Sequence, residues 1–447
     1  MSVPPSWPSP LRAWWTVVVL TLAYVVSFVD RTILSLLIEP IKVDLALSDT
    51  EIALVQGLAF AIFYAAMGLP LGWLADRMSR RLLVACGVGC WCLATAACGL
   101  AGSFAQLFVA RIGVGFGEAA LSPAALSLIS DSFPKERRAL PIGVYAGAAA
   151  LGAGLALILG GSVIGMVSHA EGVALPGLGV VRPWQAAFVV VGVAGLLLLP
   201  LLASVQEPAR RNEHPLAAGA APRIGRYVLE HASFMVRHYV AISCFAVLIY
   251  AALSWIPAHL IREFGLSPAE VGWRYGLVLL VCGGSGTVAG AALANALARR
   301  GVGQAPIVVT ALGMVGSGIL LAIAASSDSI DVALPWYGLG LLCLTLPGGT
   351  AIQVVQEAVP NELRGQASAI YYLCISLLGL TFGPLSVALL TDHWFADPVR
   401  VGDALAVVAA VIGPATALLA YSTRAPFARL ERSVAAGRAV VAGEVPA

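Results

Sequence analysis

Long apolar stretches separated by short polar ones run along almost the whole chain. Each apolar stretch has about 20 to 25 residues, the length of α-helix that crosses a hydrocarbon core of roughly 30 Å. The alternating pattern of a membrane β-strand is absent, and helices of this length satisfy their own backbone groups in lipid. The pattern predicts twelve membrane-spanning helices, at 13–39, 51–74, 82–101, 106–130, 139–164, 185–204, 238–261, 269–297, 305–325, 332–356, 365–390 and 403–422.

Composition excludes several other classes of protein. The 447 residues are 59% hydrophobic and only 11% charged, whereas soluble domains have about 25% charged residues. A soluble enzyme and a disordered scaffold are therefore excluded, and the net charge of +2 does not indicate a nucleic-acid partner. The eight cysteines lie in apolar runs without zinc-ligand spacing, so we expect packing thiols, no metal and no cofactor. A phosphate-binding loop sequence is absent, which excludes an ATP-driven pump, and no catalytic constellation indicates an enzyme.

Lysine and arginine residues gather at one end of the predicted helices. Nineteen of the 26 lie in loops that share one side of the membrane, and four lie on the other side. Because positively charged loops stay in the cytoplasm, we expect both termini there. The polar stretch at 205–237 separates six helices from six, so the sequence predicts an N-terminal bundle at 1–204, a cytoplasmic linker at 205–237, a C-terminal bundle at 238–422 and a cytoplasmic tail at 423–447. The tail is either partly helical on the membrane surface or disordered.

The two halves of the chain carry related loop sequences. Gly72–Arg81, after the second predicted helix, is similar to Ala291–Arg300, after the eighth, at a shift of 219 residues. Pro134–Arg138, before the fifth helix, is similar to Pro360–Arg364, before the eleventh, at a shift of 226 residues. Internal duplication of this kind is typical of secondary transporters.

Several motifs resemble those of the major facilitator superfamily. Gly72–Arg81 is similar to its signature between the second and third helices, with serine at position 79 where that signature usually has glycine. Arg111–Glu118 resembles its basic, glycine-rich fourth-helix motif. Phe28–Arg31 in the first helix and Gly117–Ala125 in the fourth together resemble the Spinster group, including its bacterial members.

The resemblance implies an all-α membrane fold of twelve helices in two six-helix bundles, which works by alternating access. Animal members of the Spinster group move sphingosine phosphate and lysophospholipids, which implies a lipid-like amphiphile as the substrate. The resemblance to the bacterial members implies a location in a bacterial inner membrane. An Asp-Arg pair in the first helix also occurs in the anion:cation symporters, so small organic acid anions stay open as an alternative. The fifth helix has the glycines of the antiporter motif but lacks its proline, which weakens the case for antiport.

Four charged side chains are predicted to lie deep in the membrane: Asp30, Arg31, Arg111 and Glu118. Each costs at least about 2.5–3.5 kcal/mol at the centre of a bilayer, so each needs a reason. The helical rise places Asp30 about 13 Å and Glu118 about 18 Å from the outer ends of their helices. We therefore expect Arg31 to contact Glu118, and Asp30 to turn toward Arg111 or another donor. The group is either a static salt bridge or a proton-coupling site, in which a substrate headgroup competes for Arg31 and so changes the proton affinity of Glu118.

The charged loop after the second helix has two interpretations. Its positive charge holds the loop in the cytoplasm. The superfamily resemblance adds a gating role, in which Asp76 meets the N-terminus of the eleventh helix near Arg364. The residues of this gating motif are Gly72, Asp76, Arg77, Arg80 and Arg81.

The second half of the chain is poorer in membrane-embedded charge. Glu270 and Arg274 are spaced to pair near the outer start of the eighth helix. The predicted substrate cavity comprises Arg31, Glu118, Tyr145, Tyr250, Ser254, Trp255, Gln353 and Tyr371, with Thr350 and Gln356 as further candidates. These weakly polar groups could instead form hydrogen bonds between helices.

The sequence thus predicts a proton-coupled secondary transporter of a lipid-like amphiphile. Its partners would be protons, the lipid bilayer and a small amphiphilic or anionic substrate, and the protein would be a monomer. A channel and a non-transporting receptor are the competing classes. Saturation and counterflow would separate a carrier from a channel.

Overall fold

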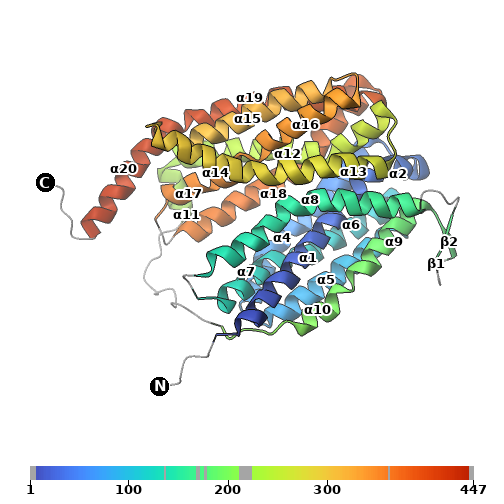
Figure 1. Ribbon diagram of the computed structural model, residues 1–447, viewed down its shortest axis with the longest axis horizontal. Helices are drawn as coiled ribbons and strands as arrows, with labels where there is room; N and C mark the ends of the chain where they lie inside the picture. The colour runs from blue at the N-terminus through green and yellow to red at the C-terminus, as the bar shows by residue number, and fades with distance from the viewer. Residues whose placement is uncertain are drawn as a thin grey trace. The chain divides into compact units, whose positions relative to one another are not determined.

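The computed structural model describes residues 7–134, 137–167, 172–175, 179–210, 224–360 and 363–441 (Figure 1). Twelve helical segments are long and apolar enough to cross a membrane, and they agree with the predicted spans to within a few residues at most ends. The predicted fold class is therefore confirmed. Their bounds are Pro10–Leu36, Asp49–Gly68, Arg80–Cys98, Phe104–Ser132, Leu140–Met166, Pro183–Ser204, Ala232–Phe264, Pro268–Arg299, Ala305–Ala325, Ile330–Ala358, Arg364–Phe395 and Pro398–Arg432.

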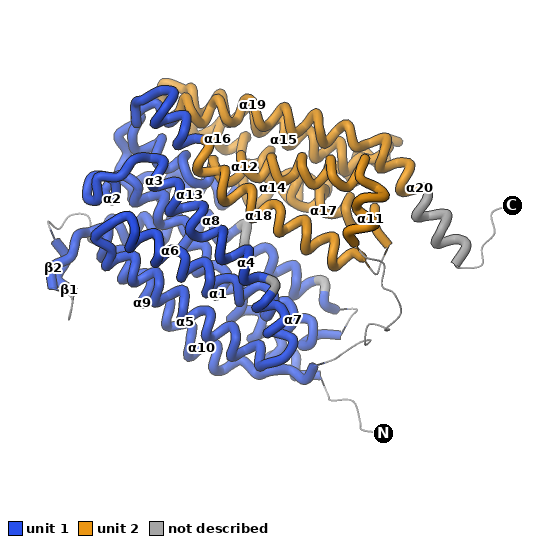
Figure 2. Tube along the Cα trace, turned by 180° about the vertical axis from the view of Figure 1, so that it is seen from behind, with its two compact units in different colours: residues 1–213, 253–281, 387–401 blue, residues 214–252, 282–386, 402–447 orange. Residues whose placement is uncertain are grey.

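The chain forms two compact units, which Figure 2 shows in different colours. Unit 1 comprises residues 1–213, 253–281 and 387–401. Its elements include α1 (Pro10–Leu36), α2 (Ile38–Leu45), α3 (Asp49–Ala53), the π-helical turn η1 (Leu54–Leu58), α4 (Ala59–Ala75), α5 (Arg80–Cys98), α6 (Phe104–Glu118), α7 (Leu121–Ser132), α8 (Ala139–Val167), β1 (Val173–Leu175), β2 (Gly179–Val181), α9 (Pro183–Gly195), α10 (Leu198–Ser204), α13 (Pro268–Val278), the π-helical turn η5 (Leu390–Phe395) and the 3₁₀ turn η6 (Pro398–Arg400).

Unit 2 comprises residues 214–252, 282–386 and 402–447. It contains α11 (Ile224–Glu230), α14 (Gly284–Arg299), α15 (Ala305–Ala325), α16 (Ile330–Thr345), α17 (Pro347–Ala358) and α20 (Arg424–Val441). Most of α18 (Arg364–Leu389) and of α19 (Val401–Ser422) also belongs to it. The helix α12 (Ala232–Phe264) and the π-helical turn η3 (Leu279–Gly283) are likewise divided between the two units.

Four predicted helices are interrupted next to a proline. The first breaks at Leu37, the fourth after Glu118, the sixth after Gly195 and the tenth at Leu346. Each break places the following proline in the first turn of a new helix, where its missing N–H removes no intrahelical bond; these prolines are Pro40, Pro123, Pro200 and Pro347. Sequence reasoning expected continuous helices here and was wrong in these details.

The breaks in the fourth and tenth spans lie at matching positions. Ala120 precedes α7 as its N-cap and Leu346 precedes α17, 226 residues later. The same shift relates the loops at Pro134–Arg138 and Pro360–Arg364. Residues 135, 136, 361 and 362 of those loops lie outside the described residues. The matched breaks support an internal duplication, because the same shift along the chain relates both the loop sequences and the positions of the helix breaks.

Within unit 1, α6 lies very close to α4 and α5. A Cβ atom at Gly115 would stand 2.4 Å from the carbonyl oxygen of Phe60 on α4. One at Gly117 would stand 2.6 Å from the backbone nitrogen of Trp91 on α5. Small residues let helix backbones approach in this way in membranes. The glycines of the fourth-helix motif therefore fix the position of Glu118, the last residue of α6.

Two segments of secondary structure were not predicted. The loop between the fifth and sixth spans contains a two-stranded antiparallel hairpin in which Val173 pairs with Val181, and the predicted linker contains α11. The tail contains α20, in agreement with the expectation of a partly helical tail. Residues 211–223 of the linker, residues 1–6 and residues 442–447 of the tail lie outside the described part of the chain.

Candidate functional site

An ion pair deep in unit 1 joins α1 to α6. The Nε atom of Arg31 donates a hydrogen bond to Glu118 Oε2 at 2.6 Å, and Nη2 lies 2.5 Å from the same oxygen. The Glu118 side chain is fully buried and that of Arg31 is 17% exposed. The contact expected from the depths of the two residues is present. We call Asp30, Arg31, Arg111 and Glu118 the Arg31 cluster.

Three aromatic rings surround the guanidinium of Arg31. Its Cζ atom lies 4.7 Å from the ring centre of Phe60, 4.9 Å from that of Tyr64 and 5.4 Å from that of Phe28. Ring faces attract cations, more strongly where water is excluded. The Phe60 ring also lies 5.9 Å from the guanidinium of Arg111. The rings therefore stabilise the positive charge of Arg31 beside its ion pair with Glu118.

The second acid of the cluster, Asp30, has Arg111 and Thr95 as its neighbours. Arg111 donates to the backbone carbonyl of Asp30, at 3.1 Å, and not to its carboxylate. The hydroxyl of Thr95 is a near neighbour of this carboxylate, and Glu118 and Arg111 act on it through their charges. Neither carboxylate oxygen makes a well-formed hydrogen bond with a described residue, and the same holds for Glu118 Oε1.

The helix backbone also disfavours a negative charge on Glu118. This residue ends α6, where the helix dipole presents partial negative charge. A carboxylate there is disfavoured unless a cation offsets it, and Arg31 is that cation. The two side chains are thus strongly interdependent, and a change in the charge of one changes the environment of the other.

A second cluster in unit 1 was missed by the sequence analysis. Arg262, in the part of α12 that belongs to unit 1, donates two bonds of 2.7 Å to the two carboxylate oxygens of Asp49. Its Nε atom donates to Glu39 at 2.6 Å, and Lys42 pairs with the same Asp49. Asp49 is fully buried and Arg262 is 5% exposed. We call Glu39, Lys42, Asp49 and Arg262 the Arg262 cluster.

Next to this cluster, α3 and η5 are also tied together. Both the backbone nitrogen and the hydroxyl of Thr50 donate to Asp392, at 2.7 and 2.6 Å. The Arg262 guanidinium lies 5.6 Å from the ring centre of Trp255. Trp255, a predicted cavity residue, is fully buried and lies next to this cluster.

One residue of the predicted gating motif, Arg80, is the centre of a buried hydrogen-bond network. Arg80 is buried and donates to Glu207 Oε1 at 2.8 Å, to the Ser127 hydroxyl at 3.0 Å and to the Pro208 carbonyl at 2.9 Å. It also pairs with Asp131. Arg80 thus binds α5, α7 and the start of the linker together.

Glu207 accepts hydrogen bonds within this network. Burial alone would raise the pKa of Glu207, but hydrogen bonds from Arg80, from the backbone of Arg81 and from Ser79 bring that pKa below its usual range. Its position directly after the sixth span is the sequence signal that could have identified it.

The remaining residues of the gating motif are more exposed. Asp76 lies exposed at the end of α4. Arg77 stacks on the ring of Trp73, with its Cζ atom 3.8 Å from the ring centre. Gly72 has Pro123 as its nearest neighbour on the Cβ side, at 3.9 Å.

The predicted cavity residues do not form one group. In unit 1, Tyr145 stacks on Tyr24 at 4.9 Å and donates to Ser122 at 3.4 Å. Ser254 is half-buried on α12. Tyr24 also contacts Phe28 edge-on, at 5.3 Å, so aromatic contacts connect Tyr145 to the Arg31 cluster.

Four further candidates lie in unit 2. Tyr250 packs against α18, where a Cβ atom at Gly379 would stand 2.6 Å from its ring. Tyr371 is buried edge-on against Tyr372, at 5.2 Å. Gln353 is exposed and donates to Glu357 at 2.8 Å, and Gln356 is exposed as well.

Thr350, a further cavity candidate, is buried in a hydrogen bond of 2.8 Å with Thr310 of α15, which is the alternative of a bond between helices. The interpretation of Glu270 needs correction. Glu270 forms a capping box with Ser267 at the start of α13, and no ion pair joins it to Arg274 within 4 Å. A capping box satisfies two orphan N–H groups of the first turn, which outweighs a surface ion pair.

Comparison with known proteins identifies the family. The profile of the Major Facilitator Superfamily matches residues 20–384. The chain belongs to this superfamily. Its members are transporters, so the protein is a membrane transporter and its family gives no indication of catalysis.

Among curated proteins, an MFS-type efflux pump of Mycolicibacterium smegmatis is 32% identical over 87% of this chain and 86% of its own length. The protein spinster of Drosophila melanogaster is 25% identical over 87% of this chain and 65% of its own. The hexuronate transporter of Bacillus subtilis is 25% identical over 84% of this chain and 87% of its own.

One solved structure shares the fold closely. It is a bacterial homologue of the human lysosomal transporter Spinster, in an inward-facing and unoccupied conformation. The two match with a TM-score of 0.78 and 24% identity over 95% of this chain and 98% of the other. This match shows the shared fold, and together with the similarity to the spinster protein of Drosophila melanogaster it confirms the expected resemblance to the Spinster group.

Proposed function

We propose that this transporter moves an anionic, lipid-like amphiphile together with protons. The observation that carries the proposal is the Arg31–Glu118 ion pair, enclosed by the rings of Phe28, Phe60 and Tyr64. A guanidinium among aromatic rings suits a molecule with a small anionic headgroup and an apolar body. The similarity to spinster proteins favours a lysophospholipid or a phosphorylated sphingoid base.

Proton coupling follows from competition for Arg31. A proton on Glu118 removes the charge that holds Arg31, so the guanidinium becomes available to an anionic headgroup. An anion bound to Arg31 in turn weakens its hold on Glu118 and favours the protonated acid. Proton and anion therefore promote each other's binding by the same factor. Asp30 and Arg111 set the charge around this exchange, and Tyr145 extends the aromatic surface.

The wider architecture belongs to the same proposal. The protein would act as a monomer in the bacterial inner membrane, with both termini in the cytoplasm. Bundles at 1–204 and 238–422 would alternate access around the site, joined by a linker at 205–237 and followed by a tail at 423–447. Asp76 would close the cytoplasmic side against the helix that begins at Arg364.

Residues of the second half would line the substrate path: Tyr250, Ser254, Trp255, Gln353 and Tyr371. The gating motif would comprise Gly72, Asp76, Arg77, Arg80 and Arg81.

A second candidate substrate class is the small organic acid anion. The similarity to a hexuronate transporter favours it, and Arg31 could bind a carboxylate as readily as a phosphate. The aromatic surroundings favour the amphiphile, because a sugar acid would need several hydrogen-bonding groups around its hydroxyls.

Binding to the purified protein at pH 6 and pH 8 tests both candidates. The panel holds a lysophospholipid, a sphingoid phosphate, a hexuronate and a cationic amphiphile. We expect the anionic lipids to bind roughly tenfold more tightly at pH 6, within the usual range of coupling between sites. Arg31→Gln should abolish this difference, and the charge-matched control Arg299→Gln should retain it.

Other outcomes would redirect the proposal. Binding of the hexuronate alone would establish the organic-acid class. A cationic amphiphile that binds more tightly at pH 8 would indicate exchange against protons, as an efflux pump could use. Lipid binding that is equal at the two pH values would refute the proposed coupling.

A further inference from the structure

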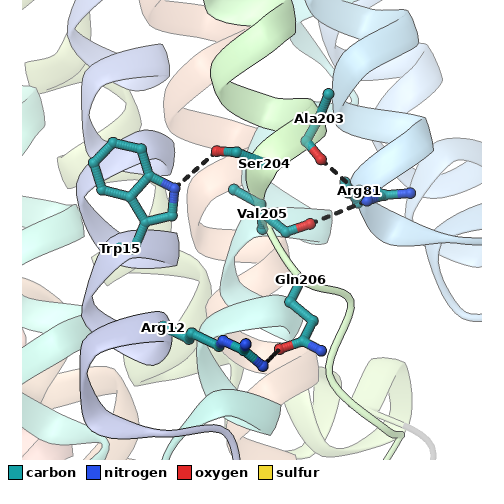
Figure 3. A pocket seen from close by; sticks show the side chains of 7 residues that line it. All are labelled: Arg12, Trp15, Arg81, Ala203, Ser204, Val205 and Gln206. Carbon is teal, nitrogen blue, oxygen red and sulfur yellow. Dashed lines mark hydrogen bonds between the residues drawn. The ribbon is translucent and has the colours of Figure 1, made fainter.

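A cavity of about 330 Å³ lies at the N-terminal end of α1, the helix that carries Asp30 and Arg31 near its other end (Figure 3). Arg12 and Trp15 of α1 line one side of it, and Arg81 of α5 lines another. Residues 203–206, at the end of α10, pass between them. Two guanidinium groups from different helices therefore border one cavity that no acidic side chain lines.

Both arginines are held by neutral oxygens. Arg12 Nη1 donates to Gln206 Oε1 at 3.1 Å. Arg81 Nη1 donates to the carbonyl oxygens of Ala203 and Val205, at 3.3 and 3.2 Å. Each contact uses only the Nη1 atom of a group with five N–H donors. The positions of both side chains are thus set, while most of their donors are not used by described residues.

The nearest acids are already engaged elsewhere. Glu207 accepts bonds from Arg80, from the Ser79 hydroxyl and from the backbone nitrogen of Arg81. Asp131 pairs with the same Arg80. Two acids thus share one buried guanidinium, while the side-chain charges of Arg12 and Arg81 have no ion-pair partner among the described residues.

The apolar surface beside the cavity points to lipid. Trp15 is 41% exposed and its indole N–H donates to Ser204 at 2.8 Å. Such amphipathic rings favour the boundary between headgroups and acyl chains. From this level, exposed apolar side chains continue along α1, at Val18 and Leu22, and along α9 and the turn after it, at Val193 and Leu197.

We propose that this cavity binds the phosphate of an anionic phospholipid. The phosphodiester would accept bonds from Arg12 and Arg81, and the acyl chains would lie against the apolar side chains of α1 and α9. Basic pockets between helices on the cytoplasmic side of a membrane suit such headgroups. A free phosphate shares the headgroup chemistry, and the apolar rows favour the lipid. The inference concerns a structural lipid and is independent of the transported substrate. It rests on the proposed orientation only in assigning the lipid to the cytoplasmic leaflet.

Native mass spectrometry of the full-length protein released from mixed-lipid nanodiscs tests this site. The probes are phosphatidylglycerol, phosphatidylcholine and inorganic phosphate. We expect one retained phosphatidylglycerol, weakened by added salt, with phosphatidylcholine not retained. The double variant Arg12→Gln/Arg81→Gln should lose affinity about 30-fold, at roughly 1 kcal/mol for each cation near an anionic surface. The control Arg299→Gln/Arg300→Gln removes the same charge from two exposed positions and should bind as the wild type does.

A single variant separates the loss of a ligand contact from a loss of local structure. Because Arg81 also supports the end of α10, Arg12→Gln is measured alongside; it loses only the bond to Gln206 and should still weaken lipid binding several-fold. Equal retention of phosphatidylcholine, or equal losses in the control variant, would overturn the proposal. Displacement of the lipid by inorganic phosphate at the same concentration would overturn the lipid as the ligand.

Discussion

Two clusters in unit 1 pair an arginine with carboxylates, but they differ in how completely the carboxylate oxygens are hydrogen-bonded. In the Arg262 cluster, both oxygens of Asp49 accept bonds from one guanidinium, whose Nε atom is taken by Glu39. In the Arg31 cluster, both contacts from Arg31 fall on a single oxygen of Glu118. The other oxygen of Glu118 and the Asp30 carboxylate lack well-formed bonds to described residues.

The difference concerns what a proton would do at each place. A proton on Asp49 would have to break a bidentate bond, the strongest geometry that the pair allows. A proton on Glu118 can add at Oε1 without breaking an existing bond, and it relieves charge at the end of α6. Full pairing therefore suits a contact that holds helices together, and partial pairing suits a group that changes its protonation state.

The strongest test of this contrast is Glu118→Gln. The amide keeps the shape of the acid but cannot take up or release a proton, so we expect proton-driven accumulation of substrate in proteoliposomes to fall by roughly 1,000-fold, within the range for a group that transfers protons. Substrate counterflow without a pH gradient should persist. The control Glu270→Gln alters a carboxylate that only caps α13, and wild-type pH dependence in Glu118→Gln itself would refute the assignment.

Breaking the fully paired cluster should chiefly affect structure. Arg262→Gln leaves Asp49 and Glu39 without their guanidinium, and loss of one partner from a buried pair costs about 3 kcal/mol or more. We expect faster hydrogen–deuterium exchange in α2, α3 and the end of α12. Lys42→Gln should have a smaller effect, since Lys42 pairs with one oxygen of Asp49 only. Unchanged exchange in Arg262→Gln would show that the cluster does not hold these segments together.

A double-mutant cycle at the Arg31 cluster gives a sharper comparison. Arg31→Gln should lower the free energy of unfolding by about 2 kcal/mol in mixed micelles at pH 8. This is less than the loss expected if the buried partner stayed charged, because Glu118 can take up a proton and become neutral. The cost should shrink at pH 5. Arg31→Gln/Glu118→Gln should be more stable than Arg31→Gln alone at pH 8. A cost that is independent of pH would indicate a static salt bridge.

The Arg31–Glu118 contact could be predicted from the sequence because charges within apolar runs are rare and costly. Their depths follow from the helical rise, and few partners exist at each depth. The same reasoning could not find Phe60 and Tyr64, because aromatic residues are ordinary members of apolar runs and only the close approach at Gly115 brings Phe60 to the cluster.

The Arg262 cluster was missed for the opposite reason. Glu39, Asp49 and Arg262 lie at helix ends, where a charged side chain costs little free energy and is common. Arg262 and Asp49 are 213 residues apart, so no local pattern pairs them. The helix breaks were hidden as well, because Pro40 and Pro123 are compatible both with a kinked helix and with a new first turn.

The smallest expected effect comes from a third arginine–carboxylate contact, between Arg80 and the half-buried Glu207. Because the pKa of Glu207 is lowered in the folded protein, its stabilisation is present above the unfolded pKa of about 4.3 and is lost as the pH falls through the lowered value. We expect Glu207→Gln to cost at most about 1 kcal/mol at pH 7, after screening by solvent, and almost nothing near pH 3. Unfolding of the variant and the wild type across this range measures the difference, with the exposed pair partner Glu230 as the control in Glu230→Gln. A difference that grows toward low pH would contradict the sign of the shift and would place Glu207 with the groups that take up protons.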